Sequence, residues 1–191
     1  MTGTRALALV CALLAAGCAT PPFETRAPAA PSVPFDLSAR VAVRYDGQAF
    51  SSGLRWQHGS GRDEIWLLSP VGQAFVHIVD EGDGALLTSA DQRQHRAASV
   101  EALTRQALGW ELPVARLKHR LRGEVAPGAP PESVARDAAQ RIVRMEQAGW
   151  RITVGYEPPQ ENPGLPRRLE LARGSHEIRL VIDTWRNEAG P

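Results

Sequence analysis

Apolar and polar residues alternate with a period of two from Phe35 onward. In the first run, every second residue from Leu37 to Tyr45 is apolar or aromatic, and charged or small residues stand between them. An Asp46-Gly47 pair then gives a strong signal for a two-residue hairpin turn, and the alternation resumes from Phe50 to Gln57. Because successive side chains of a strand point to opposite faces, this spacing predicts antiparallel strands that are buried on one face.

The segment 65–79 has the pattern of two apolar strands joined by a Pro70-Val71-Gly72 turn. Turns between strands are normally polar, yet no charged residue occurs from Ile65 to Val76. Two interpretations stay open at this point. The turn is either a buried or incidentally exposed hairpin tip, or an apolar tip that contacts lipid.

The period changes after residue 98, where two short helices are expected. Ser99 can cap a helix that ends at Gly109, and Pro113 suits the first turn of a second helix that ends at Gly123. Apolar residues recur on one side of each helix: Val100, Leu103, Ala107 and Leu108 in the first, and Val114, Leu117 and Leu121 in the second.

The remaining strands are expected at 86–88, 92–96, 141–147, 150–156, 165–172 and 176–183, with a Pro/Gly-rich loop at 125–131. The result is about ten antiparallel strands with the two helices late in the order. Short connections favour a meander. Both a closed barrel and a sheet rolled around the helices are compatible with this pattern.

The N-terminus has the features of an export signal followed by a lipidation site. Arg5 precedes an apolar run from Ala6 to Ala16, which is too short to span a bilayer and suits a signal peptide. The run ends in small residues before Cys18, which resembles a bacterial lipobox, although Ala15 stands where leucine is usual. The expected organisation is a signal peptide at 1–17, lipidated Cys18 with a Pro/Ala-rich tether at 18–34, and one domain at 35–191.

Cysteine usage and charge narrow the class of protein. The other cysteine of the chain, Cys11, lies in the leader. The mature chain would therefore have no internal disulfide and would depend on its core for stability. The chain has 22 basic and 21 acidic residues, and this balance argues against a general nucleic-acid binder.

No catalytic or metal-binding constellation is evident in the sequence. The five histidines are far apart in the sequence, and neither a G-x-S-x-G nucleophile motif nor a phosphate-binding loop occurs. The acidic segment 80–84 lacks the spacing of a calcium loop and suits a hairpin turn. An enzyme is therefore not expected, and neither a cofactor nor a metal is implied.

Several short motifs, in this order and after a lipobox, together resemble the LolB family of outer-membrane lipoprotein receptors. They are Arg40–Val43, Leu54–Trp56, Leu67–Gly72, Leu108–Pro113, Gln147–Trp150, Leu165–Arg167 and Ile182–Trp185. One departure is Val71, where the family usually has leucine between proline and glycine.

The resemblance implies an unclosed antiparallel half-barrel of about ten or eleven strands, with two or three short helices filling its concave side. It implies a monomer anchored in the inner leaflet of the outer membrane and facing the periplasm. Such a protein accepts triacylated lipoproteins from a LolA-like carrier in an apolar cavity and inserts them into outer-membrane lipid. The alternative is a small outer-membrane lipoprotein that acts as an assembly scaffold and has a filled core.

Strand parity, combined with this resemblance, predicts which side chains line the acyl-chain cavity. Five tryptophans either fill a core or form the walls of an open cavity. Phe75 and His77 are expected to point outward, and Pro70, Val71 and Gly72 to form the membrane-insertion turn. The predicted lining consists of Leu54, Trp56, Ile65, Leu67, Val76, Ile78, Leu103, Trp110, Leu117 and Trp150.

Cys18 is predicted to be the first residue of the mature protein and to carry lipid. The short apolar run that ends in Ala16-Gly17-Cys18 motivates this expectation. An intact-mass measurement of the protein purified from membranes should give a triacylated chain that begins at Cys18. An unmodified N-terminus, or cleavage at another position, would contradict the prediction.

Overall fold

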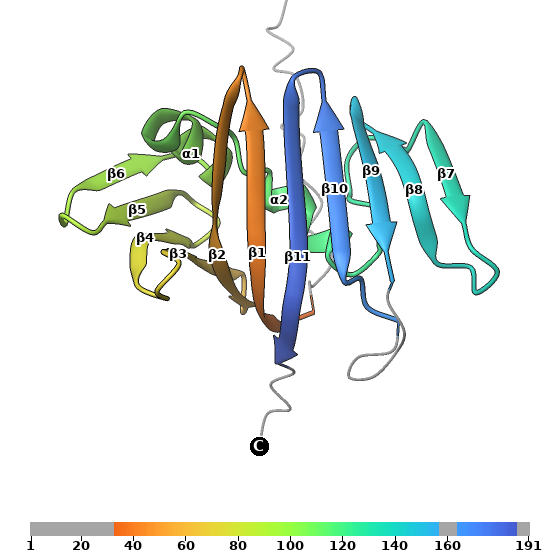
Figure 1. Cartoon of the computed structure of the whole chain (residues 1–191), viewed down its shortest axis with the longest axis horizontal. Helices are drawn as coiled ribbons and strands as arrows, with labels where there is room; N and C mark the ends of the chain where they lie inside the picture. Colours follow the sequence, from red (N-terminus) through yellow and green to blue (C-terminus); the bar gives the residue numbers. More distant parts are fainter. Residues whose placement is uncertain (1–32, 157–163, 187–191) are drawn as a thin grey trace, which may run out of the picture. The chain divides into compact units, whose positions relative to one another are not determined.

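The computed structural model describes residues 33–156 and 164–186, which form one antiparallel sheet and two short helices (Figure 1). The predicted signal peptide, Cys18 and most of the tether lie outside the described residues. The strands are β1 (Phe35–Tyr45), β2 (Gln48–Gly59), β3 (Arg62–Leu68), β4 (Ala74–Asp80), β5 (Ala85–Ser89), β6 (Gln94–Ala97), β7 (Ser133–Arg136), β8 (Ile142–Gln147), β9 (Trp150–Gly155), β10 (Arg168–Arg173) and β11 (His176–Arg186). The helices are α1 (Val100–Leu108) and α2 (Val114–Arg120).

The sheet has eleven strands in the order β6-β5-β4-β3-β2-β1-β11-β10-β9-β8-β7. Within each half, every strand pairs with its neighbour in the sequence, as a meander requires. The halves join where β1 pairs with β11, so the first and last strands lie at the centre of the sheet (Figure 1). Because β6 and β7 lie at opposite edges, the sheet is unclosed, and the closed-barrel alternative is wrong.

The predicted Asp46-Gly47 turn and both predicted ends of the first helix are present in the structure, whereas the second helix ends at Arg120, before the predicted Gly123. Asp46 and Gly47 both have positive φ (46° and 79°), as the tight turn between β1 and β2 requires. The Ser99 hydroxyl accepts a hydrogen bond from the backbone amide of Ala102 at 3.3 Å and caps α1, which ends at Gly109 in the left-handed conformation.

The sequence prediction differs from the structure at β7 and at several strand ends. All four residues of β7 are exposed, so this edge strand has no buried face and gives no apolar alternation. The turn predicted at 58–61 is shorter, because His58 and Gly59 continue β2. Strand β10 begins at Arg168, later than predicted, after Pro166.

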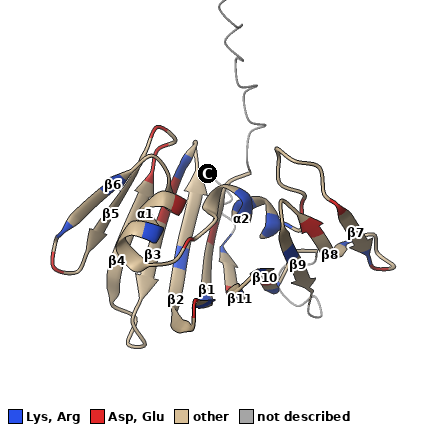
Figure 2. Ribbon diagram, turned by 90° about the horizontal axis from the view of Figure 1, so that it is seen from above, with Lys and Arg blue, Asp and Glu red and all other residues tan. Residues whose placement is uncertain are grey.

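Both helices lie on the same face of the sheet (Figure 2). Inward-facing side chains of the strands pack with apolar side chains of the helices in a single buried cluster. This cluster includes Leu37 and Val41 from the centre of the sheet, Leu103 from α1 and Leu117 from α2. The apolar periodicities of the strands and of the helices therefore meet in one core.

A buried carboxylate joins the sheet to α2. Asp63 is almost inaccessible to solvent and accepts hydrogen bonds from Nε1 of Trp56 at 2.7 Å and from Nδ1 of His58 at 2.8 Å. The ammonium of Lys118, on α2, lies 3.8 Å from the other oxygen of Asp63. A buried carboxylate is costly unless it is paired in this way, so Asp63 and its donors depend on one another.

Replacing Asp63 with alanine should lower the free energy of unfolding by about 3 kcal/mol, because two buried N–H donors lose their acceptor. Urea unfolding followed by tryptophan fluorescence measures this change. The matched control is Asp83→Ala at an exposed turn residue, for which the change should stay within about 0.5 kcal/mol. Equal stabilities of the two variants would show that the Asp63 network contributes nothing.

Candidate functional site

The ten residues predicted to line an acyl-chain cavity all lie in the buried core cluster. Each side chain is at most 4% exposed, and Leu117 and Leu103 are completely covered. The structure therefore brings together side chains from three neighbouring strands, both helices, the segment between the helices and strand β9. In the arrangement described, this lining is covered by protein.

Strand register explains why six of these residues form a continuous apolar surface. Leu54 of β2 lies opposite Leu67 of β3, which in turn lies opposite Val76 of β4. One step along the strands, Trp56, Ile65 and Ile78 form a second row in the same way. The two rows cross three strands on the inner face of the sheet, as their parity predicted.

The C-terminal half of the sheet contributes a second apolar surface that the prediction largely omitted. Only Trp150 was named from this half, although the same alternation is present there. Apart from Trp150, the buried apolar residues from β8 to β11 are Ile142, Met145, Ile152, Val154, Leu169, Leu171, Ile178, Leu180 and Ile182. Strand parity would have found eight of these nine, because each of them alternates with more exposed residues in its strand. Ile142 is the exception, since it lies three residues before Met145 and breaks the alternation of β8.

The turn between β3 and β4 holds Val71 away from the domain. The amide of Ser69 donates to the carbonyl of Gln73, and the amide of Gly72 donates to the carbonyl of Ser69, both at 2.8 Å. Gly72 has a φ of 80°, which residues with a side chain rarely adopt. Val71 is 80% exposed, so the interpretation of a buried hairpin tip is wrong.

Phe75 does not point outward, because a bulge changes its parity. The register shifts between Leu67 and Leu68, and Phe75 becomes the extra residue on β4. Its ring packs against the core cluster, 6.3 Å from the ring of Phe50, which lies 5.5 Å from that of Trp110. Phe75 therefore extends the apolar interior toward the turn.

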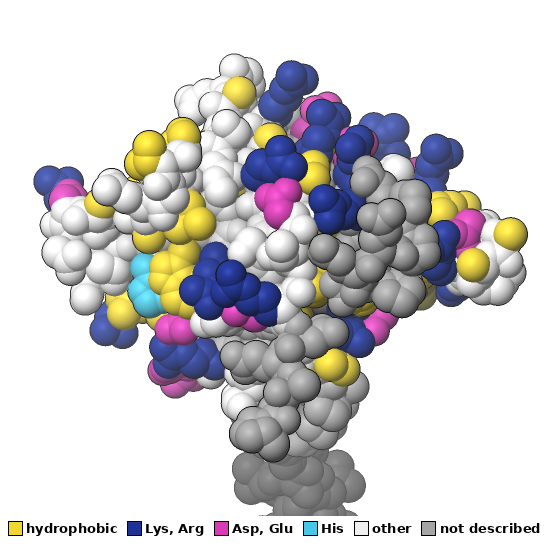
Figure 3. All heavy atoms as spheres, turned by 60° about the horizontal axis from the view of Figure 1, so that its bottom comes forward, with side chains coloured by type: hydrophobic (Ala, Val, Ile, Leu, Met, Phe, Trp, Pro, Cys, Tyr) yellow, Lys and Arg dark blue, Asp and Glu magenta, His cyan; other side chains and the backbone are white. Residues whose placement is uncertain are grey.

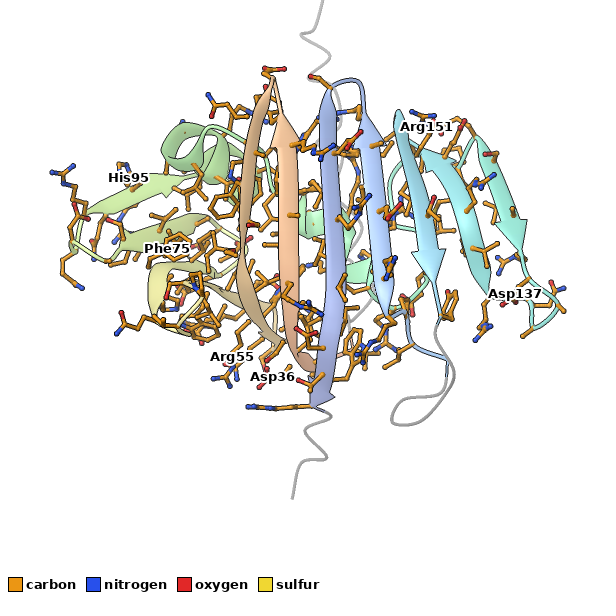
Figure 4. All side chains as sticks on the ribbon, in the orientation of Figure 1. Asp36, Arg55, Phe75, His95, Asp137 and Arg151 are labelled. Atoms are coloured by element: carbon orange, nitrogen blue, oxygen red, sulfur yellow. The ribbon has the colours of Figure 1, made fainter. Side chains whose placement is uncertain are left out.

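Outward-facing residues near this hairpin form a stack of rings and charges. The rings of Trp66 and His77 are parallel and 4.9 Å apart, with the guanidinium of Arg55 5.4 Å from the Trp66 ring. Arg55 also pairs with Asp36 at 3.0 Å, at the lower end of the central strands (Figure 4). Burial raises the pKa of Asp36, but hydrogen bonds from Arg55 and Gln57 outweigh this effect and hold the pKa below its usual value.

The outer face of the C-terminal strands has a different character. A hollow of about 550 Å³ crosses β1 and β8–β11 there, and four of its lining residues are the arginines Arg44, Arg144, Arg151 and Arg179. Glutamates alternate with these arginines, and Arg179 pairs with Glu170 at 2.9 Å. Basic and acidic side chains are also intermixed on the face shown in Figure 3. Such a lining does not suit acyl chains.

Residues 33–156 and 164–186 contain neither a metal-binding cluster nor a membrane-spanning helix. No group of three or more histidine, cysteine, aspartate or glutamate side chains in these ranges is arranged to hold a metal ion. Neither α1 nor α2 is long and apolar enough to cross a membrane.

Known proteins of one family are similar to this chain over most of its length. A family model described as "Outer membrane lipoprotein LolB" matches residues 33–185. A relative from Nitrosomonas europaea named outer-membrane lipoprotein LolB is 40% identical over 157 residues, which cover 81% of this chain and 74% of the relative. A relative of the same name from Thiobacillus denitrificans is 37% identical over 187 residues, which cover 96% and 98%.

Among solved structures, a DUF1329 family protein from Desulfovibrio piger has a TM-score of 0.51 at 8% sequence identity. The match covers 84% of this chain and 88% of that chain. At such low identity, the likeness supports the fold alone.

Proposed function

We propose, from the premise that this chain belongs to the LolB family of outer-membrane lipoproteins, that it receives triacylated lipoproteins and inserts them into the outer membrane. The family places the chain at the outer membrane with a lipid anchor, and Cys18 is the residue proposed to carry that lipid. The donor would be a LolA-like periplasmic carrier. The observation that supports this proposal best is the apolar inner face of an unclosed sheet, on which the described residues place two short helices.

The cost of exposing acyl chains to water explains why such a receptor is needed. Each buried methylene contributes about 0.8 kcal/mol, so three chains of roughly 14 methylenes cost on the order of 30 kcal/mol to expose. Transfer therefore requires a continuous apolar route from carrier to receptor to bilayer. The sequence has no phosphate-binding loop, and transfer would run downhill through differences in affinity.

Entry of an acyl chain requires that part of the covering structure moves aside, because the proposed lining is buried. The helices are suited to such movement. Helix α1 has nine residues and α2 has seven, and isolated helices shorter than about 12 residues are marginal in water. Packing on the sheet therefore stabilises them, and an acyl chain that enters would replace the apolar contacts that their movement breaks.

Binding of an apolar fluorescent probe tests whether the interior accepts acyl chains. The protein comprises residues 18–191 with Cys18→Ala, so that no anchor of its own competes. We expect saturable binding that a long-chain acyl compound displaces, and loss of binding in Leu117→Glu, because the new charge would be buried without a partner.

The assembly-scaffold alternative predicts the opposite result. It is favoured by the nearly complete burial of the ten lining side chains, and a filled core would leave the probe unbound. Because Leu117→Glu also threatens folding, its thermal midpoint has to be measured alongside. A folded variant that still binds the probe would remove Leu117 from the site.

The exposed Val71 turn is proposed to contact the bilayer interface during delivery. Val71 has one methylene fewer than the leucine usual in the family, which lowers its contribution by about 0.8 kcal/mol. The contact should therefore be weaker than in relatives with leucine. Phe75, which follows the turn, packs against the core cluster and is not exposed beside Val71 as its parity predicted.

Val71→Glu should leave the thermal midpoint and acceptance of lipoprotein from the carrier unchanged, and should impair release into liposomes. The reason is that Val71 has few contacts to lose, while a carboxylate resists entry into the apolar part of the bilayer. The matched control is Val134→Glu, at a valine of β7 that is 39% exposed. Normal release by folded Val71→Glu would place insertion elsewhere on the surface.

A further inference from the structure

Arg120 is a buried cation on the inner side of α2. The residue is only 2% exposed, and no carboxylate in the described part of the chain lies within salt-bridge distance of it. Its guanidinium donates to the side-chain oxygen of Gln147, to Sδ of Met145 at 2.6 Å and to the carbonyl of Glu124 at 3.4 Å. All three acceptors are neutral.

These contacts leave the charge of Arg120 uncompensated. Removing a charge from water costs several kcal/mol unless an opposite charge and good hydrogen bonds repay it, and a thioether is only a weak acceptor. Burial, together with the nearby charge of Arg116, lowers the pKa of Arg120 to about 10. At neutral pH the guanidinium therefore remains protonated in the interior.

Arg120 also lines a small cavity. Its volume is about 10 Å³, which is room for roughly one water molecule. Six residues from α2 and its N-terminal flank and from strands β9 and β10 line it: Pro113, Arg116, Arg120, Trp150, Ile152 and Leu171. None of the six carries a side-chain hydrogen-bond acceptor.

Trp150, which lines the same cavity, adds a buried donor without a partner. Its Nε1 is buried, and no hydrogen-bond partner for it exists among the described residues. A water molecule could satisfy this N–H group but would leave the charge of Arg120 uncompensated, and a neutral ester carbonyl would do the same. Only an anionic acceptor both compensates the charge of Arg120 and accepts a hydrogen bond from Nε1 of Trp150.

The residues that line the cavity also indicate that the anionic group carries an apolar chain. Ile152 and Leu171 are apolar, and both belong to the core cluster whose other members form the proposed acyl-chain surface. Arg116 is exposed and lies one helical turn before Arg120, and both cations line the cavity. Figure 2 shows the basic positions of α2 in blue on the helix-bearing face of the sheet.

We propose that Arg116, Arg120 and Trp150 form a site for the acidic headgroup of an amphiphile whose acyl chain lies in the apolar interior. The headgroup is a carboxylate or a phosphate, from a free fatty acid or from an acidic phospholipid. The site rests on the proposed function, because the chain of this ligand needs the same interior as a lipoprotein. A headgroup larger than one water molecule also needs the cavity to widen, through the same movement of the helices that admits acyl chains. Such a ligand competes with lipoprotein acyl chains for that space.

The test compares cis-parinaric acid with its methyl ester, which have the same fluorescent chain and differ in the charge of the headgroup. Residues 18–191 with Cys18→Ala are titrated with each probe at mildly alkaline pH. We expect the acid to bind about tenfold more tightly than the ester. Arg120→Met, which keeps the length of the side chain and removes its charge, should bring this ratio close to one and leave ester binding intact.

Two further variants keep the result interpretable. Arg116→Met changes an exposed residue and should fold normally, and we expect it to lower the acid-to-ester ratio about threefold. Arg96→Met, at an exposed arginine of β6, is the matched control and should leave the ratio unchanged. An equal affinity for acid and ester, or an unchanged ratio in both Arg116→Met and folded Arg120→Met, would overturn the site.

Displacement experiments separate the two sources of the headgroup. Oleate and a lysophosphatidate with the same chain each compete with bound parinaric acid, and the stronger competitor identifies a carboxylate or a phosphate site. The two probes also distinguish loss of the headgroup site from loss of the acyl-accepting interior. If the ester binds as well as the acid, only the headgroup site is lost, whereas no binding of either probe would contradict an acyl-accepting interior as well.

Discussion

The structure depends on covering one apolar face of a sheet that does not close. Eleven strands present an inner face of aliphatic and aromatic side chains, and the chain between edge strands β6 and β7 supplies the two helices on that face. The hydrophobic effect drives the two helices onto the sheet. This effect has no directional preference. The same face can therefore be satisfied by helix side chains or by the acyl chains of a lipid.

Polar contacts determine how helix α2 is positioned on the sheet. Asp63 joins β2 and β3 to Lys118 of α2, and Arg120 joins the same helix to Gln147 of β8. Gln147 in turn donates to the carbonyl of Ala126, in the loop that follows α2. These directional contacts tie a seven-residue helix to both halves of the sheet, while most of the surrounding area is interchangeable apolar contact. Such a design suits a receptor that exchanges one apolar partner for another.

Much of the fold could be predicted because its signals are local. Alternation identified the inner face of β1 to β4, and Asp46-Gly47, Ser99 and Gly109 determined a turn and the ends of a helix. Strand β7 was missed because an exposed edge strand has no buried face to reveal it. The pairing of β1 with β11 was beyond local patterns, since it joins residues at opposite ends of the domain.

The candidate site was predictable to the extent that parity holds. Parity placed Leu54 and Ile65 correctly and failed at Phe75, where a bulge inserts one residue into β4. Arg120 was missed for another reason. It lies three residues after Leu117, on the same side of the helix, but arginine is rarely fully buried, and its burial depends on Gln147 of a distant strand.

We propose above all that acyl chains of a lipoprotein occupy the inner face of the sheet during transfer. The most direct measurement uses a lipoprotein with photoreactive acyl chains, loaded on its carrier and illuminated after mixing with this protein, followed by peptide mapping of the adducts. We expect adducts on inward-facing residues such as Leu54, Ile65 and Leu117. Adducts confined to outward-facing residues such as Trp66 or to the charged face of β8–β11 would contradict this proposal.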